Sequence, residues 1–178
     1  MGQRLTIDIL DNGERIGIIY YHWSAYFASA IAELKLVKDD IVKAKNEKKD
    51  ILLAIIEGLE LRGGGLDISP KTRAIAEKEW PYRKFRYDIS RNCGLLCLDE
   101  DDINETEAMS EGMASIDISS EEATSDVDLE DAIRIDKKLL PYDPFDIMSF
   151  EQLEKVFKKV DELYKKAFNK FSSLEVKT

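Results

Sequence analysis

The feature that most constrains the fold is a pair of segments rich in β-branched residues on either side of Asp11-Asn12-Gly13. The first segment reads LTIDIL and the second ERIGIIYY. Asparagine and glycine tolerate the positive φ angles that a tight hairpin turn requires. The sequence therefore predicts that the fold opens with two antiparallel strands.

The hydrophobic period changes after the hairpin. From Ala25 to Val42 the apolar residues recur near helical spacing, and Ser24 is the candidate N-cap of this helix. Two shorter helices are expected to follow, one over residues 51–61 that ends at Gly63-Gly64-Gly65, and one from Ser69-Pro70 to about Trp80.

The clearest element is a helix at the C-terminal end of the sequence. Ser149 and Gln152 have the spacing of a capping box. A single apolar stripe follows, made of Phe150, Leu153, Val156, Phe157, Val160, Leu163, Tyr164, Phe168 and Phe171. Three further strands are predicted in CGLLCLDED, ASIDIS and DAIRID. We therefore predict an α+β fold, in which helices cover a mostly antiparallel sheet and residues 1–178 form one domain.

Several classes of protein are disfavoured by composition. No apolar run approaches the roughly 20 residues of a membrane span, and the first residues lack the layout of a signal peptide, so we expect a cytoplasmic protein. Cys93 and Cys97 are too far apart along one strand to form a disulfide and are expected to be reduced packing residues. With one histidine and this cysteine spacing, we expect neither a metal site nor a cofactor.

Charge is distributed very unevenly along the chain. Residues 99–131, called the acidic stretch below, contain fourteen aspartates and glutamates and no lysine or arginine. Because the whole chain has a formal net charge of −10, the remainder sums to +4. Such a concentration of like charge attracts basic partners from beyond contact distance. One interpretation is that the acidic stretch imitates nucleic-acid phosphates and occupies the basic groove of a nucleic-acid-binding protein.

Phosphate mimicry sets a geometric condition. Duplex DNA carries about one charge per 1.7 Å of axis, whereas a strand rises about 3.3 Å per residue and alternates its faces. The chain would reach this charge density only if two acidic segments, LDEDDINETE and SSEEATSDVDLED, lay side by side. The predicted partner-binding residues are Asp99, Glu100, Asp101, Asp102, Glu105, Glu107, Glu121, Glu122, Asp126 and Asp128. The alternative is a solvated, partly mobile insertion at 99–131 that keeps the protein soluble.

A basic stretch precedes the acidic one. In YRKFRY, residues 82–87, cations and aromatic rings are mixed as in sites for single-stranded nucleic acid or nucleotides. The same aromatics would equally suit strand residues that face the core. A nucleotide- or RNA-binding protein, or an enzyme that acts on such a ligand, is therefore the alternative hypothesis, with candidate residues His22, Tyr26, Arg83, Lys84 and Arg86.

The segment YYHWSAY, residues 20–26, spans the predicted strand-to-helix corner. Tyr20, Trp23 and Phe27 are expected to anchor the first helix on the sheet, while His22, Ser24 and Tyr26 would line a surface pocket. His22 and Ser24 are the catalytic candidates. A hydrolytic triad also needs an orienting carboxylate and an oxyanion hole, which the sequence does not show, so we expect a protein without catalytic activity.

The opening of the chain resembles a group of known proteins. Met1-Gly2-x-Arg4, then Asn12-Gly13, then Tyr21-x-Trp23-x-x-Tyr26 are similar to the start of small, mostly uncharacterised phage and bacterial proteins, over about the first 35 residues. Those proteins usually have Asp-Gly where this chain has Ser24-Ala25. The resemblance implies a phage or prophage accessory protein. Together with the acidic stretch, it leads to the hypothesis of an inhibitor of a host defence protein, of the anti-CRISPR or anti-restriction type.

Overall fold

The computed structural model describes residues 3–87, 93–127 and 147–175, without the side chains of residues 167, 168 and 170–175. The predicted strand in DAIRID and the predicted site residue Asp128 lie outside the described residues. The elements are β1 (Leu5–Asp11), β2 (Glu14–Tyr21), α1 (Phe27–Glu47), α2 (Ile51–Leu61), β3 (Gly65–Leu66), α3 (Pro70–Glu79), β4 (Leu95–Cys97), α4 (Glu100–Ala108), β5 (Gly112–Asp117), β6 (Glu122–Ser125), β7 (Met148–Ser149) and α5 (Phe150–Glu175).

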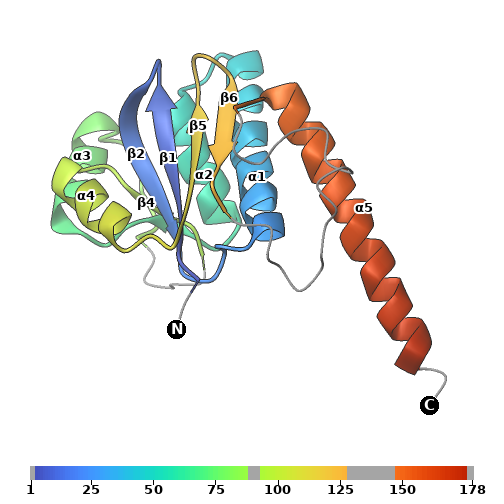
Figure 1. The fold of residues 1–178 in the computed structure, drawn as a ribbon. Helices are drawn as coiled ribbons and strands as arrows, with labels where there is room; N and C mark the ends of the chain where they lie inside the picture. Colours follow the sequence, from blue (N-terminus) through green and yellow to red (C-terminus); the bar gives the residue numbers. More distant parts are fainter. Residues whose placement is uncertain (1–2, 88–92, 128–146, 176–178) are drawn as a thin grey trace.

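The strands form one seven-stranded sheet in the order β3-β4-β2-β1-β5-β6-β7. The pairs β1–β2, β2–β4, β5–β6 and β6–β7 are antiparallel, and β1–β5 and β3–β4 are parallel. Helices α1 and α2 pack on one face, with α5 beside α1 (Figure 1). The predicted α+β fold with a mostly antiparallel sheet is therefore confirmed. Among the described residues, no helix has the length and apolar character needed to span a membrane.

The N-terminal hairpin forms as predicted. Asp11 pairs with Glu14, and the two residues between them, Asn12 and Gly13, have φ angles of 52° and 84°. Two positive φ angles in a two-residue loop are the conditions of a type I′ turn, whose twist matches that of the strands. The Asp117 carboxylate accepts the backbone N–H groups of both turn residues, at 3.2 and 2.7 Å. The hairpin turn is thereby attached to the end of β5.

Strand alternation decides which face of the sheet the helices cover. Leu5, Ile7 and Ile9 of β1 are completely buried in the main core. They pack with residues of α1, including Phe27 and Ile31, so this side is called the covered face. Alternate side chains of a strand point to opposite faces, so the residues between them belong to the other side. That side is called the open face.

Helix α1 begins later than predicted. Its N-cap is Tyr26, which makes no side-chain capping bond, so the assignment of Ser24 as N-cap was wrong. The cause is a tertiary hydrogen bond, because the backbone N–H of Ala25 donates to the Gln3 carbonyl at 2.9 Å. This bond attaches Ala25 to the segment that leads into β1. The helix therefore starts at Phe27.

The remaining predicted helix ends are confirmed. The Ser69 hydroxyl caps α3 by accepting the Lys71 N–H, and Gly63 follows α2 with a φ of 90°. At the start of α5, the Gln152 N–H donates to Ser149 Oγ at 3.1 Å and the Ser149 N–H donates to Gln152 Oε1 at 2.8 Å. This reciprocal pair is the predicted capping box.

Helix α5 packs against α1 through its first turns. Leu153, Val156 and Val160 are buried in the core. Lys38 of α1 is also buried and forms ion pairs with Glu154 and with its neighbour Asp39. The helix then continues past the end of α1 (Figure 1). The predicted stripe residues Phe168 and Phe171 fall among the side chains that are not described.

Candidate functional site

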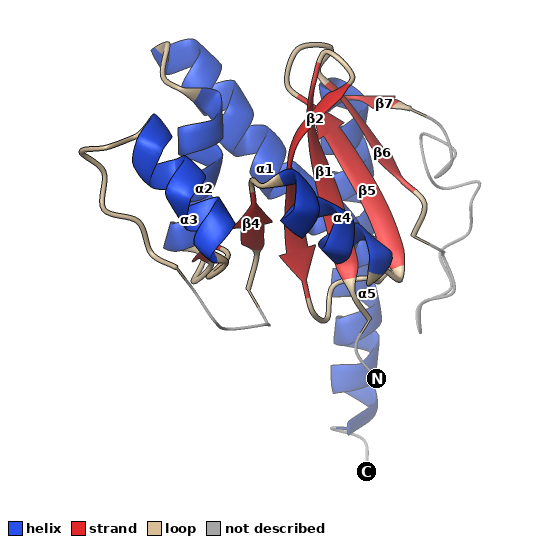
Figure 2. Cartoon of the chain, turned by 90° about the vertical axis from the view of Figure 1, so that its left-hand side faces the viewer, coloured by secondary structure: helices blue, strands red, loops and turns tan. Residues whose placement is uncertain are grey.

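The open face is only partly covered by a helix. Helix α4 packs on this face over β2 and β4, where Ile103 buries its side chain with Ile18 and Cys97. In Figure 2, α4 lies in front of the sheet and α5 behind it, while β6 has no helix in front of it. The surface of β1, β5 and β6 next to α4 is therefore available for contact with other molecules.

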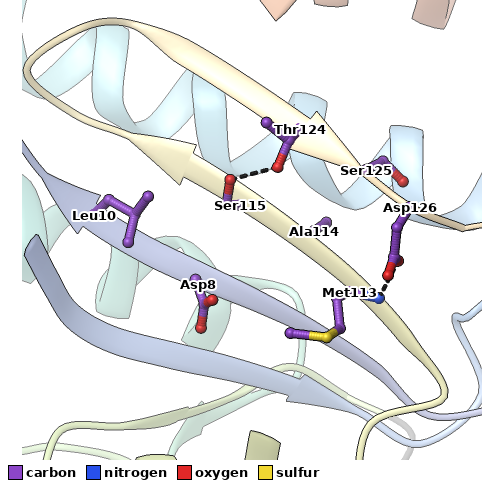
Figure 3. Close-up of a pocket in the computed structure, with 8 residues that line it drawn as sticks. All are labelled: Asp8, Leu10, Met113, Ala114, Ser115, Thr124, Ser125 and Asp126. Carbon is purple, nitrogen blue, oxygen red and sulfur yellow. Dashed lines mark hydrogen bonds between the residues drawn. The ribbon is translucent and has the colours of Figure 1, made fainter. Parts of the chain in front are cut away.

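This uncovered surface contains a hollow of about 380 Å³ (Figure 3). Its lining residues come from β1, β5, β6 and the residue after β6, and they are Asp8, Leu10, Met113, Ala114, Ser115, Thr124, Ser125 and Asp126. Register explains the gathering, because Asp8 pairs with Ser115 and Ser115 pairs with Thr124 across neighbouring strands. Three polar side chains therefore stand in one row across the sheet.

The polar groups in the hollow are hydrogen-bond acceptors or hydroxyls. Ser115 and Thr124 share a hydrogen bond of 2.6 Å between their hydroxyl oxygens. The Asp126 carboxylate accepts the Met113 N–H, also at 2.6 Å. Burial raises the pKa of Asp8, against the opposing influence of Arg15. The hollow thus combines the partly desolvated Asp8 carboxylate, the Asp126 carboxylate and the hydrogen-bonded hydroxyl groups of Ser115 and Thr124.

Arg15 connects the hollow to α4. Its guanidinium contacts Asp8 at 3.5 Å, Glu107 at 2.9 Å and the Asn104 side-chain oxygen at 3.0 Å. A planar guanidinium with several fixed donors is well suited to such a divided set of acceptors. The chain itself therefore already binds one guanidinium group on the open face.

The exposed side of α4 is acidic. Ile103 and Thr106 are buried toward the sheet, which leaves Glu100, Asp101 and Glu105 exposed on the outer side. Sequence analysis did not predict this helix. A signal was nevertheless present, because Asp99 precedes three further acids, and aspartate is a favoured N-cap with acids preferred in the first turn. The Asp99 carboxylate indeed accepts the N–H groups of Asp101 and Asp102.

The structure divides the acidic stretch between two places. Residues 100–108 form α4 over β2, whereas residues 122–125 form β6, and β1 and β5 lie between β2 and β6. The described parts of the two acidic segments are therefore not neighbours, and these parts do not meet the geometric condition for matching the density of phosphates. Three interstrand steps of roughly 4.8 Å separate their strands, about 14 Å in total. Both nevertheless contribute carboxylates to the open face.

Many predicted partner-binding acids have structural contacts. Asp101 forms an ion pair with Lys71, Asp102 accepts from the Thr72 hydroxyl, and Glu121 forms an ion pair with Lys45. The described acids of the stretch that form no ion pair are the exposed Glu100, Glu105 and Glu122, together with Asp102, Asp117 and Asp126. The carboxylates of the last three accept hydrogen bonds from the Thr72 hydroxyl or from backbone N–H groups. The three exposed glutamates are thus the most available for a partner.

The basic stretch does not form a free cationic surface. Arg83 contacts Glu57 and Glu60 of α2 at 3.3 and 3.4 Å. Phe85 and Tyr87 pack against the core, in agreement with the prediction that these aromatics could face the core. The Tyr82 ring, by contrast, is fully exposed. Lys84 is exposed as well.

The corner at residues 20–26 differs from the prediction in part. Phe27 is buried as expected, but Trp23 is 48% exposed and Tyr20 belongs to the open face, where its hydroxyl hydrogen-bonds His22 Nδ1 at 2.8 Å. Tyr21 is the aromatic that β2 contributes to the core instead. Tyr20 of β2 pairs with Leu95 of β4, which pairs with Gly65 of β3, and the Arg86 carbonyl accepts the N–H of Leu66 in β3. Strands β4 and β3 therefore lie between the corner and the backbone of Arg86.

The remaining candidates for chemistry have defined surroundings. His22 is bonded to Tyr20, so its observed partner is not Ser24. Cys97 is buried, and burial raises the pKa of its thiol to about 12, which disfavours the reactive thiolate. Cys93 is half-buried, and both cysteines are free. Within residues 3–87, 93–127 and 147–175, no group of three or more histidine, cysteine, aspartate or glutamate side chains is arranged to hold a metal ion.

Comparison with known proteins gives no match. No family model, no curated protein and no solved structure is significantly similar to this chain.

Proposed function

We propose that the protein is a non-enzymatic inhibitor that docks through its open face on a basic nucleic-acid-handling protein of the host. A phage-encoded inhibitor of a CRISPR effector or restriction enzyme is the form that the N-terminal resemblance favours. The observation that carries the proposal is the acidic character of the open face. Its carboxylates come from α4 on one side and from the strands on the other.

The charge balance on this face supports attraction of a basic partner. Arg15 is shared between Asp8 and Glu107, and Lys71 is paired with Asp101. These cations are therefore neutralised within the protein, while exposed glutamates on α4 and β6 keep their charge. Charge complementarity of this kind accelerates association and makes it sensitive to salt. We therefore propose that separate acidic groups contact the basic groove of the partner. This differs from the closely spaced imitation of phosphates that the sequence suggested.

The test is inhibition of DNA cleavage in a panel of purified CRISPR effectors and restriction endonucleases. The variant Glu100→Gln, Glu105→Gln and Glu122→Gln removes three exposed charges that have no ion pair in the structure. A matched control is Glu77→Gln, Glu79→Gln and Glu162→Gln, which changes the net charge equally on α3 and α5, where all three side chains are exposed.

The open-face variant should inhibit at least about tenfold less well, which corresponds to roughly 0.5 kcal/mol for each removed charge. The control should inhibit like the native protein. Inhibition that is equally strong in both variants, or that does not weaken with added salt, contradicts the proposal.

Nucleotide or RNA binding is the alternative function, and it has one supporting observation. Tyr82, whose ring is fully exposed, lies two residues before the exposed cation Lys84. Fluorescence anisotropy with a labelled RNA oligomer measures this directly. Binding that is lost in Tyr82→Ala and Lys84→Ala would favour the alternative.

A further inference from the structure

We propose that the hollow formed by β1, β5 and β6 receives an arginine side chain of the basic partner. This inference rests on the proposed function and names the group that the open face recognises.

The lining of the hollow combines apolar and charged side chains. Leu10 and Met113 supply apolar surface, and Met113 is 37% exposed. Asp8 and Asp126 supply carboxylates, and the labelled side chains of Figure 3 show Asp8 and Met113 beside each other on adjacent strands. An arginine has the same division, because its aliphatic stem packs on apolar surface while its charged head binds acceptors. A volume of about 380 Å³ lies within the usual range for side-chain and small-ligand pockets.

The acceptors in the hollow have unused capacity. The contact from Arg15 to Asp8 is 3.5 Å long, and burial raises the pKa of Asp8, so its carboxylate is incompletely compensated. Each carboxylate has about four lone-pair positions, and each hydroxyl has two. The hydrogen bonds of Ser115, Thr124 and Asp126 within the protein occupy only some of these positions.

Arginine fits this set of acceptors better than other ligands do. A phosphate group would meet two carboxylates, so anions are repelled. A lysine ammonium is a compact and strongly hydrated charge, whereas the guanidinium is planar, carries five donors and is more weakly hydrated. Arg15, bound by Asp8, Glu107 and Asn104, shows the same recognition on the adjacent part of the face.

The experiment uses the full chain labelled with ¹³C at the methionine methyl groups. Met113 lines the hollow, Met109 is exposed at the end of α4, and Met148 is completely buried on the covered face. The probes are an arginine nonamer and a lysine nonamer, titrated at low salt. We expect the arginine peptide to shift the Met113 methyl resonance while Met148 stays in place, and to bind about tenfold more tightly than the lysine peptide.

Two variants test the lining. Asp126→Asn removes one carboxylate, and the pair Ser115→Ala with Thr124→Val removes the hydroxyls without changing charge. Each should weaken the arginine peptide by about tenfold, the usual effect of losing a hydrogen bond to a charged group. The matched control is Glu162→Gln, which removes one exposed charge from α5, away from the open face. An unchanged Met148 resonance shows that each variant is folded.

The outcomes separate this inference from the proposed function. If arginine and lysine peptides bind equally, or Met113 does not shift, or the lining variants bind the arginine peptide as tightly as Glu162→Gln does, the hollow is not an arginine site. The proposal that the acidic open face attracts a basic partner would then still stand. If neither peptide binds at low salt, the acidic face does not attract basic partners, and both proposals fail.

Discussion

The two faces of the sheet are built from alternate residues of the same strands and differ in almost every property. In β1, Leu5, Ile7 and Ile9 are completely buried, whereas Asp8 and Leu10 line an open hollow. The covered face is held by apolar packing against α1, α2 and α5. The open face has carboxylates and hydroxyls that pair locally. The contrast teaches that alternate residues of one strand can bury a core on one side while leaving polar side chains accessible on the other.

The covered face also contains charged groups, and their surroundings differ from those on the open face. Asp40 of α1 pairs with Arg62, which follows α2, at 2.9 Å. Burial raises the pKa values of Glu33 and Asp40, while Arg62 lowers both. These ionisable groups therefore cost stability in their charged form, unlike exposed carboxylates. They offer a second way to test the contrast between the faces.

The largest expected effect is the loss of a core side chain. Ile7→Ala should lower the free energy of unfolding by about 2–5 kcal/mol, because it removes buried apolar surface and leaves a cavity. Leu10→Ala, in the same strand but facing the hollow, should cost about 1 kcal/mol or less. Urea denaturation of both variants measures the difference. Equal losses would mean that the open face is covered in solution and would remove the contrast.

A smaller effect is expected from breaking the ion pair between α1 and α2. Arg62→Met leaves the half-buried Asp40 carboxylate without its partner and should cost about 1–3 kcal/mol. The exposed pair of Lys165 with Asp161, one helical turn apart on α5, is the control. Lys165→Met should change the stability by less than about 0.5 kcal/mol. If both substitutions have the same cost, burial does not distinguish these two pairs.

The pH dependence of stability should have opposite signs for Glu33 and Asp117. Burial raises the folded-state pKa of Glu33 above its ordinary value of 4.5, so its ionised form weakens the fold at neutral pH. As the pH falls through the raised pKa, this cost decreases, and it is gone below the unfolded value. Glu33→Gln should therefore stabilise the protein at pH 7, with a difference that disappears near pH 4.

Asp117 should show the reverse dependence. Burial opposes ionisation, but four backbone N–H donors, from Asn12, Gly13, Ser119 and Ser120, together hold its pKa below the ordinary value of 3.8. Its contribution is complete above that value and is lost as the pH falls through the folded-state pKa. Asp117→Asn should destabilise the protein at pH 7 and lose this effect in acid. Unfolding curves from pH 3 to 8 measure both variants, and parallel curves would contradict these assignments.

The smallest effect on stability is expected at the outer side of α4. Glu105→Gln should change the free energy of unfolding by less than about 0.5 kcal/mol, because the side chain is exposed and has no ion pair in the structure. Its effect on association with a basic peptide should be visible in the rate of binding at low salt. Stopped-flow measurements at two salt concentrations check this expectation.

The sequence by itself determined the features that depend on neighbouring residues. The hairpin turn at Asn12-Gly13, the cap at Ser69 and the capping box of Ser149 with Gln152 all form as predicted, because positive φ angles and side-chain caps are local properties. The hydrophobic periods similarly identified α1, α2 and α5. Together these elements were enough to predict an α+β fold with a mostly antiparallel sheet.

Only the tertiary structure decided the features that depend on distant pairing. The parallel pairing of β1 with β5 places Asp8 beside Ser115, and the sheet order separates α4 from β6. The hydrogen bond from Ala25 to Gln3 delays α1, and Trp23 is exposed although its aromatic character favoured burial. Strand order and helix packing bring together residues about a hundred positions apart, and local propensity carries no information about those contacts. The candidate site on the open face is therefore a product of topology.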